Sequence, residues 1–397
     1  MSQNSSIQVI KKSSIPLWRD ERVIQGFTQI VSAVLVIGFL IFFVSNVLQA
    51  AEDRGLNLGY DFLDEAAGFP LAESPIPYDE SQSFGYAFLV GILNTIKAAS
   101  IGILLATILG VITALARLST NWLVSKIASV YIEIISNIPL LVQLFIWYFA
   151  VFKNMPPVKE SIEGPGPSYL SQRGLYLPAP QPTATFGAWL IFVVGAIIAA
   201  GVVRWVLHRH QLNTGKGTYP YVFASVVLIG LPILGWIVVG DSPLVADIPV
   251  LSTFNFEGGM RLTPEFAAIL AGLVVYTGAF IAEVVRAGIL AVDRGQFEAA
   301  RAVGLRGLQV LRLVVFHQAM RVIVPPLISQ YLNLTKNSSL AIVVGYPDLF
   351  FVGRTMINQA GRAVPVFAMV MAVYLFTSLT TSILMNVYNR RIQLVER

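Results

Sequence analysis

Four ionisable side chains interrupt long apolar segments of this sequence and are the first candidates for chemistry: Lys97, Glu133, Glu283 and Lys336. Ionisable groups are costly at bilayer depth, so they normally face a bundle interior and mark a transport path or a structural pair. Glu283 precedes Arg286 by three residues, which on a helix predicts a same-face ion pair. We therefore interpret Glu283 as structural and keep the other three as candidate pathway residues.

Amide side chains accompany the charged candidates. Glu133 and Asn137 are four residues apart and would share one face of a helix. Lys336 is followed by Asn337 in a polar stretch, and Gln330 lies earlier in the same apolar segment. The same groups could instead lock helices together through hydrogen bonds. The pathway candidates are Lys336, Asn337, Glu133, Asn137, Gln330 and Lys97.

The sequence offers no catalytic or metal-binding constellation. It has no cysteine and three histidines, and His208 and His210 are two residues apart, so they do not face each other on a helix. The segment 215–218 is the nearest approach to a phosphate loop, but Lys216 is not followed directly by a hydroxyl residue. The net charge of +5 comes without a basic run. We expect no enzyme, no metal site and no nucleic-acid partner.

The apolar segments are long enough to cross a membrane. Of 397 residues, 55% are hydrophobic and 12% are charged, whereas soluble domains are about 25% charged. About 20 apolar residues span a bilayer, and residues 23–51 and 363–389 contain no charge at all. Hydropathy predicts eight spans, the first of them uncleaved, at roughly 23–48, 84–116, 124–152, 185–207, 219–240, 265–287, 318–345 and 365–388.

The distribution of cations predicts the orientation. Eighteen of the 27 Lys and Arg residues fall on one side, whereas the loop 49–83 on the other side has one base, Arg54, against eight acids. Cytoplasmic loops carry the excess of Lys and Arg, so both termini are expected in the cytoplasm. The cytoplasmic segments would be 1–22, 117–123, 208–218, 288–317 and 389–397.

The remaining segments suggest how the chain is organised. The outer stretches 52–80, 153–184 and 241–264 are acidic or proline-rich and are expected to be loops. Spans 185–207 and 219–240 have almost no polar interior, so this hairpin is expected to face lipid as an insertion. We predict four parts: 1–83 (tail, first span and acidic loop), 84–152 (first half of a core), 153–262 (inserted loops and hairpin) and 263–397 (second half).

The loop after the sixth span predicts a short amphipathic helix on the cytoplasmic side. Asp293 can cap its start, the residues from Glu298 to Val303 are mostly good helix formers, and Gly304 suits a left-handed terminal position. A helix of about 12 Å is too short to span anything. It could dock into another protein, or it could rest on lipid as an interfacial helix. These physical features alone do not decide between the two.

The residues of this loop resemble a known family. Glu298, Ala299 and Ala300, followed after three residues by Gly304, match the EAA motif of ABC importer permeases. Other segments, in order, resemble the polar amino acid uptake branch of that family, and the N-terminal span and inserted hairpin resemble the longer permeases of general L-amino acid importers. These segments are 94–97, 131–143, 264–268, 276–283, 325–326 and 336–340.

The resemblance implies a fold and partners. The fold would be an all-α integral membrane protein with the core of a type I permease, like that of methionine importers, plus the extra span and hairpin. The segment 293–305 would be the coupling helix, with Glu298, Ala299, Ala300, Arg301 and Gly304 contacting an ATPase. The implied partners are an ATPase dimer that binds ATP and Mg²⁺, a second and related permease, a periplasmic amino-acid-binding protein and membrane lipid. No cofactor would be bound by this chain.

An amino acid substrate would suit the pathway candidates. Its carboxylate and ammonium could use one cation, one anion and amide partners, which Lys336, Asn337, Glu133 and Asn137 would supply. The sequence departs from the family at Phe316-His317-Gln318, where a proline usually precedes the glutamine. An ion-coupled secondary transporter is the alternative, but it should show inverted halves with matching broken spans. No such correspondence is visible.

Overall fold

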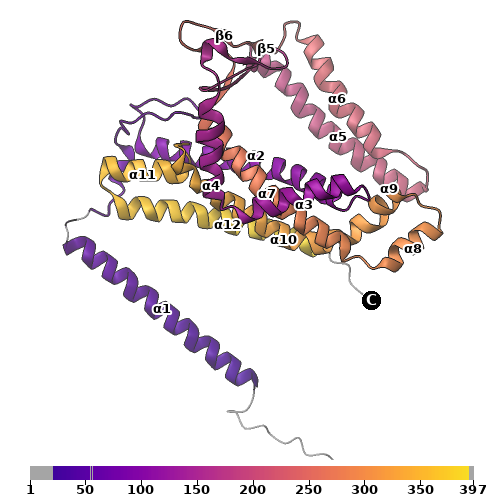
Figure 1. The fold of residues 1–397 in the computed structure, drawn as a ribbon, viewed down its shortest axis with the longest axis horizontal. Helices are drawn as coiled ribbons and strands as arrows, with labels where there is room; N and C mark the ends of the chain where they lie inside the picture. The colour runs from indigo at the N-terminus through magenta and orange to yellow at the C-terminus, as the bar shows by residue number, and fades with distance from the viewer. Residues whose placement is uncertain (1–20, 54, 56, 393–397) are drawn as a thin grey trace, which may run out of the picture.

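The computed structural model describes residues 21–53, 55 and 57–392. The predicted cytoplasmic tail 1–22 and C-terminus 389–397 therefore lie partly outside the described residues. In the described part, seven helices are long and apolar enough to span a membrane, or eight if one bent pair counts as a span. The protein is a largely helical membrane protein, as expected. Figure 1 shows most of these helices gathered in one body, with α1 standing apart from it.

The helices follow the predicted spans closely. The long helices are α1 (Glu21–Asp53), α2 (Phe84–Arg117), α3 (Trp122–Asn137), α5 (Phe186–Thr214), α6 (Pro220–Val238), α7 (Pro264–Leu290), α10 (Phe316–Asn337) and α12 (Ala363–Ile392). The shorter ones are α4 (Leu140–Phe145), α8 (Arg294–Ala302), α9 (Gly307–Val310) and α11 (Leu349–Ala360). Single 3-10 or π turns occupy Asp61–Asp64, Ile146–Val151, Phe152–Asn154, Val158–Glu160, Leu311–Val315 and Ser338–Val343.

The centre of the body is the pair α2 and α7, which pack closely because small residues of α2 face α7. A side chain at Gly110 of α2 would come within 2.5 Å of Ile281 on α7. Buried Ala106 lies one turn before Gly110 on the same face of α2. Small residues let the backbones of membrane helices approach, and close packing replaces the hydrophobic effect that lipid does not supply.

The third predicted span, 124–152, is broken into two helical segments. The axis bends by 103° between α3 and the segment Leu140–Asn154. Pro139 causes the break because it forces Ile138 into an extended conformation. The freed carbonyl groups of Ile135 and Ile138 accept hydrogen bonds from the Gln143 Nε2 group at 3.0 and 2.9 Å. Backbone carbonyl groups that lose their helical hydrogen bonds within a membrane need other donors.

Two of the three predicted outer loops pair as short strands, so expecting only loops there was wrong. The strands are β1 (Ile162–Glu163), β2 (Tyr169–Ser171), β3 (Gly174–Leu177), β4 (Ala179–Pro182), β5 (Leu244–Asp247), β6 (Val250–Leu251), β7 (Phe256–Glu257) and β8 (Met260–Leu262). They form the antiparallel sheets β1-β2-β3-β8, β4-β5 and β6-β7. Segments before and after the α5–α6 hairpin thus make one layer, at the upper edge of Figure 1.

A further helix, α11, lies between the last two spans where no element was predicted. Asp348 caps its start by accepting a hydrogen bond from the Phe351 N–H at 2.9 Å. Its buried side packs against α2, where a side chain at Gly91 would come within 3.1 Å of Val352. With the loop residues Phe62 and Phe69 it forms a second hydrophobic core at the end of the body opposite α8.

Candidate coupling helix and polar cavity

The predicted conformation of the loop after α7 is confirmed. The Asp293 side chain accepts a hydrogen bond from the Gly295 N–H at 2.6 Å, which caps the start of α8. At the other end Gly304 has φ +86°, a left-handed conformation that favours glycine. The N–H groups of Gly304 and Leu305 donate to the carbonyls of Arg301 and Ala300 at 2.9 and 3.2 Å. This pair of bonds is a Schellman motif, so both ends of α8 are closed.

α8 is held to the body by one narrow face. Ala300 is buried and Phe297 is half-buried, whereas Glu298, Ala299 and Arg301 are exposed. The Gln318 Nε2 group of α10 donates a hydrogen bond to the Gln296 Oε1 atom at 2.9 Å. The helix is therefore anchored at its back and leaves its other side chains outside.

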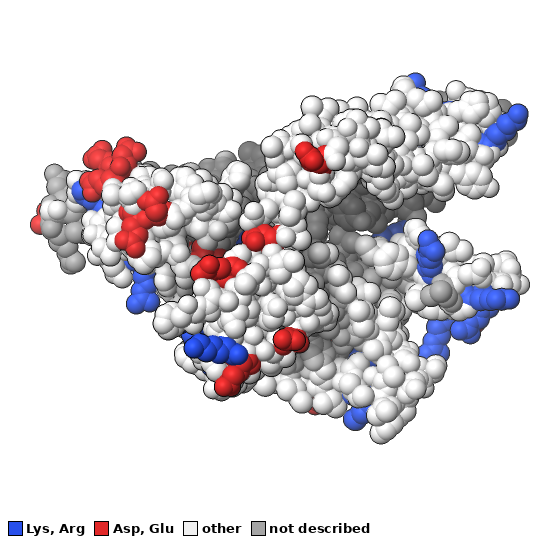
Figure 2. All heavy atoms as spheres, turned by 90° about the horizontal axis from the view of Figure 1, so that it is seen from above, with Lys and Arg blue, Asp and Glu red and all other residues white. Residues whose placement is uncertain are grey.

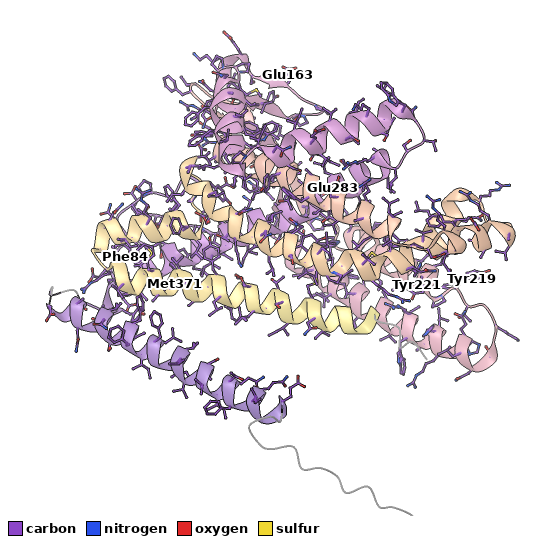
Figure 3. The ribbon with its side chains drawn as sticks, turned by 60° about the horizontal axis from the view of Figure 1, so that its bottom comes forward. Phe84, Glu163, Tyr219, Tyr221, Glu283 and Met371 are labelled. Atoms are coloured by element: carbon purple, nitrogen blue, oxygen red, sulfur yellow. The ribbon has the colours of Figure 1, made fainter. Side chains whose placement is uncertain are left out.

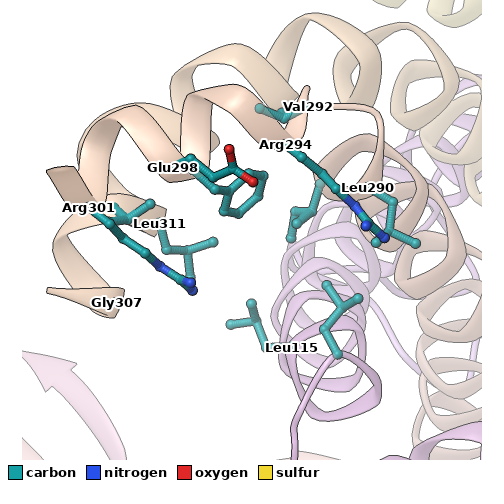
Figure 4. A pocket seen from close by; sticks show the side chains of 12 residues that line it. Leu115, Leu290, Val292, Arg294, Glu298, Arg301, Gly307 and Leu311 are labelled. Atoms are coloured by element: carbon teal, nitrogen blue, oxygen red, sulfur yellow. The ribbon is translucent and has the colours of Figure 1, made fainter. Parts of the chain in front are cut away.

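A cavity of about 640 Å³ separates α8 from the end of α2. Figure 4 shows the side chains of Arg294, Glu298 and Arg301 on one wall of this cavity and Leu115 on the other. These three charged residues recur every three to four positions, so they share one face of α8. The EAA glutamate is thus accessible beside two arginines.

The departure at His317 has a structural counterpart. Without a proline, the chain enters α10 through a continuous π turn, Leu311–Val315, and His317 is exposed. The following glutamine, Gln318, is the residue that reaches α8. The entry into α10 is therefore helical here, and no buried partner engages His317 in the described structure.

The predicted ion pair of Glu283 is confirmed and extended. The Glu283 carboxylate lies 3.5 Å from the Arg286 Nη1 atom and also pairs with Arg117 at the end of α2. Figure 3 labels Glu283 within the helical body. The ion pair between Arg117 and Glu283 joins α2 to α7 just before the loop that carries α8. Arg117 was not predicted as a partner because its contact depends on how the two helices cross.

A small polar cavity of about 250 Å³ lies between α7 and α10. Gln330, Asn333 and Asn337 line it from α10, spaced so that they share one helical face. The opposite wall consists of Tyr276, Thr277 and Phe280 on α7. Three amides beside two aromatic rings can hydrogen-bond a small polar solute.

Only two of the six pathway candidates, Gln330 and Asn337, line this cavity. Lys336 is exposed on a neighbouring face of α10. Glu133 and Asn137 are exposed on α3, where the Asn137 Nδ2 group donates to the Glu133 carbonyl at 2.7 Å. The candidates therefore do not converge on one point within this chain. Their role in substrate contact stays a prediction.

Lys97 is engaged elsewhere. Its ammonium pairs with Glu73 from the outer loop and lies 4.4 Å from the centre of the Phe266 ring. The Glu73 carboxylate also accepts a hydrogen bond from the Thr263 Oγ1 atom at 2.6 Å, and its carbonyl accepts one from the Asn94 Nδ2 group at 3.0 Å. This cluster attaches the acidic loop to the N-terminal parts of α2 and α7.

Sequence reasoning missed the α7 wall of the polar cavity. The residues of this wall, Tyr276, Thr277 and Phe280, carry no charge. The cost of ionisable groups at bilayer depth therefore does not identify them. Their segment, 276–283, resembles the family, and this resemblance is the available signal. No group of three potential metal ligands among His, Asp and Glu occurs in the described residues.

The sequence of this chain is similar to those of several known proteins. Residues 218–394 match the family model described as binding-protein-dependent transport system inner membrane component. The protein YhdX of Escherichia coli (strain K12) is 47% identical to this chain, over 93% of this chain and 94% of its own length. A crystal structure of an amino acid ABC transporter with histidines aligns over 78% of this chain and 95% of its own, with 22% identity and a TM-score of 0.46.

Two further relatives carry explicit functional names. The general L-amino acid transport system permease protein AapQ of Rhizobium johnstonii is 42% identical, over 94% of this chain and 92% of its own length. The glutamate/glutamine/aspartate/asparagine transport system permease protein BztB of Rhodobacter capsulatus is 38% identical, over 93% of each. These proteins are transport subunits rather than enzymes, as expected for this chain. The chain belongs to the amino-acid ABC transporter permeases, the multi-pass inner-membrane components of binding-protein-dependent transport systems.

Proposed function

We propose that this chain is the transmembrane subunit of an ATP-driven, binding-protein-dependent amino acid importer and that α8 couples it to a separate ATPase. The observation that carries the proposal is α8 itself, a capped helix of nine residues between two membrane helices. Because hydrogen bonds cap both ends of α8, we expect the helix to stay folded when a bound ATPase moves against it. It can therefore transmit the closure of a bound ATPase to α7 and α10.

The burial pattern of α8 favours docking to a protein over resting on lipid. An interfacial helix presents a broad apolar face to the bilayer. In α8, Phe297 and Ala300 face the body, and the exposed positions are small or polar, among them Gln296, Glu298 and Ala299. Within the segment 293–305, Val303 directly after α8 is the one large apolar residue that is exposed. A surface of this kind fits a groove in another protein better than it fits acyl chains.

The partners follow from the family and the proposed orientation. With α8 in the cytoplasm, an ATPase dimer would bind there and hold ATP and Mg²⁺, so this chain would need no cofactor. The strand layer and the acidic loop would face the periplasm, where Asp61, Asp64, Glu65, Asp79 and Glu80 are exposed to a binding protein. AapQ is named for a general L-amino acid transport system, and the resemblance of this chain to the permeases of such systems favours a second, different permease as the other half of the pathway.

The polar cavity is the part of this chain best suited to contact substrate. Amide groups can bind both the carboxylate and the ammonium of an amino acid without committing a buried charge. The aromatic rings of Tyr276 and Phe280, with centres 4.9 Å apart, close the opposite wall. Lys336, one position before Asn337, would add a cation where the partner permease completes the pathway.

Reconstitution tests the proposal. Proteoliposomes containing this chain, its ATPase, the second permease and the binding protein should accumulate radiolabelled amino acid only when ATP is inside with the ATPase domains. Hydrolysis should rise when loaded binding protein is added. Uptake by this chain alone, driven by a sodium or proton gradient, would instead support an ion-coupled carrier. Failure of any ATPase to co-purify with the chain would also contradict the proposal.

A further inference from the structure

The inserted hairpin ends in a cationic tip that the proposed transport function does not use. Arg204, Arg209 and Lys216 are all exposed near the connection between α5 and α6. No acidic residue occurs between Glu163 and Asp241, so the hairpin contains nothing that could neutralise them. Figure 2 shows basic residues at the far end of the upper arm of the molecule, with no acidic residue beside them in this view.

Aromatic rings, not carboxylates, hold the two arginines. The Arg204 Cζ atom lies 5.0 Å from the centre of the Tyr221 ring, and the Arg209 Cζ atom lies 4.4 Å from the centre of the Trp205 ring. None of the ion pairs in the described part of the chain includes either arginine. Stacking orders a guanidinium but leaves its charge and in-plane N–H donors free for an anion.

The backbone of the tip is fixed in an unusual conformation. Tyr219 has φ +44°, the one left-handed non-glycine residue of the described structure. The Thr218 Oγ1 atom donates a hydrogen bond to the Leu207 carbonyl at 2.9 Å, which ties the connection back to α5. Strain in a bulky residue persists only where its surroundings impose it, and it is concentrated at functional sites.

Tyr219 is exposed at the end of the hairpin. The residue is 71% exposed and stands beside Tyr221 (Figure 3). Tyrosine and tryptophan collect at membrane–water interfaces, with the ring among acyl chains and the polar end in the headgroups. Aromatic rings and cations therefore occur together at the tip, the combination that is typical of the lipid headgroup region.

The flanks of the hairpin are lipid-facing along their length. α5 and α6 pack chiefly on each other, and Ile197, Ile198 and Val202 are exposed on α5, as are Val226 and Ile229 on α6. In Figure 1 the pair leans away from the other helices. A molecule bound at the tip would thus meet apolar helix surface directly beneath the cations.

We propose that the hairpin tip is a binding site for anionic phospholipids, whose phosphate groups Arg204, Arg209 and Lys216 meet on different sides of the tip. The acyl chains would lie along the exposed apolar flanks of α5 and α6. A free phosphate would use the cations alone, whereas the aromatic rings and apolar flanks suit the rest of a lipid. The tip lies on the same side of the molecule as α8 in Figure 1, so the proposed orientation places the site in the cytoplasmic leaflet. Binding itself does not depend on that orientation or on transport.

Native mass spectrometry of the full chain in detergent tests the proposal. Phosphatidylglycerol and phosphatidylcholine with the same acyl chains are titrated separately, and bound lipids are counted. We expect preferential binding of phosphatidylglycerol, because each cation near a headgroup contributes about fivefold to affinity. The triple variant Arg204→Gln, Arg209→Gln and Lys216→Gln should therefore lose most of the preference. The matched control is Lys159→Gln, an exposed cation on the strand-layer side of the molecule, and it should keep the preference.

Two additional arms separate the sources of binding. The double variant Arg204→Lys and Arg209→Lys keeps the charge but loses planar stacking, so it should bind phosphatidylglycerol severalfold more weakly than wild type. Sodium phosphate at millimolar concentration should not displace the lipid. Equal binding of both lipids to wild type, an unchanged preference in the triple variant, or full displacement by inorganic phosphate would each overturn the proposal.

Discussion

Asp348 is a fully buried carboxyl group at the start of α11. Its neighbours are the Tyr374 hydroxyl, which donates a hydrogen bond to Oδ2 at 3.5 Å, and the Phe351 N–H. No cation in the described residues pairs with it. Burial raises its pKa from 3.8 to about 7. Buried ionised groups without a countercharge cost stability, so this residue should make folding depend on pH.

The sign of that dependence follows from the raised pKa. The folded state holds the Asp348 proton more tightly than the unfolded state does, so stability is highest below about pH 4 and falls as the pH rises through 7. Asp348→Asn keeps a good helix cap and cannot ionise. We expect the melting temperature of the variant to gain on wild type between pH 5 and pH 8, measured by thermal unfolding in detergent. Parallel profiles for the two proteins would show that Asp348 does not ionise in this range.

The polar cavity supports a second prediction about single residues. Replacing Asn333 with Leu removes one amide from the α10 wall, and a hydrogen bond to a charged partner contributes about 1.5–3 kcal/mol. We expect amino acid uptake at low concentration to fall about tenfold or more, while ATP hydrolysis without substrate is unchanged.

A companion variant, Lys336→Met, distinguishes the contribution of the neighbouring cation to uptake from that of the amide wall. Both are measured for uptake and for ATPase activity in the same proteoliposomes. Normal uptake by Asn333→Leu would remove the cavity from the pathway, and normal uptake by Lys336→Met would end the proposed contact of Lys336 with substrate.

For single residues, the sequence identified the important ionisable side chains better than it identified their ion-pair partners. Glu283 and Arg286 are three residues apart, so local spacing was enough to pair them. Lys97 pairs with Glu73 across 24 residues of chain, and Arg117 reaches Glu283 from another helix. Such contacts depend on the tertiary arrangement. The energetic cost of placing one ionisable residue in a membrane does not reveal which partner it has.

Among the elements, α8 was the most predictable because its signals are local. Asp293 and Gly304 fix its ends through backbone hydrogen bonds within a few residues. The break at Pro139 was less obvious because proline occurs within membrane helices when other groups satisfy the freed carbonyls. The strands were missed because each is two to four residues long, and β3 pairs with β8 on the far side of the hairpin.

The end of α8 provides a prediction at the scale of the element. An alanine in the left-handed conformation of Gly304 costs about 1–2 kcal/mol. Gly304→Ala should therefore loosen the last turn and lower binding-protein-stimulated ATP hydrolysis severalfold. Gly307→Ala is the matched control, because Gly307 is exposed and has ordinary backbone angles and open space around it. Equal activity of both variants would show that the closed end of α8 is not needed for coupling.

The molecule as a whole is polarised. The exposed acids of the loop lie at one end, whereas α8 and the hairpin tip present cations at the other (Figure 2). Helix number was predictable because hydropathy acts over long segments. The nearly apolar interior of the hairpin indicated that it faces lipid, whereas the position of α1 apart from the body was not predictable, because a helix that faces lipid has no packing partner from which to infer a position.

The contact between α8 and an ATPase is the claim on which the whole account depends. The chain has no cysteine, so Ala299→Cys introduces a single thiol on the exposed side of α8. In native membranes, a short thiol–amine cross-linker should join this position to an ATPase subunit, identified by mass spectrometry, whereas Lys159→Cys on the strand-layer side should not be joined. Absence of the cross-link at position 299, or equal cross-linking at both positions, would contradict the account.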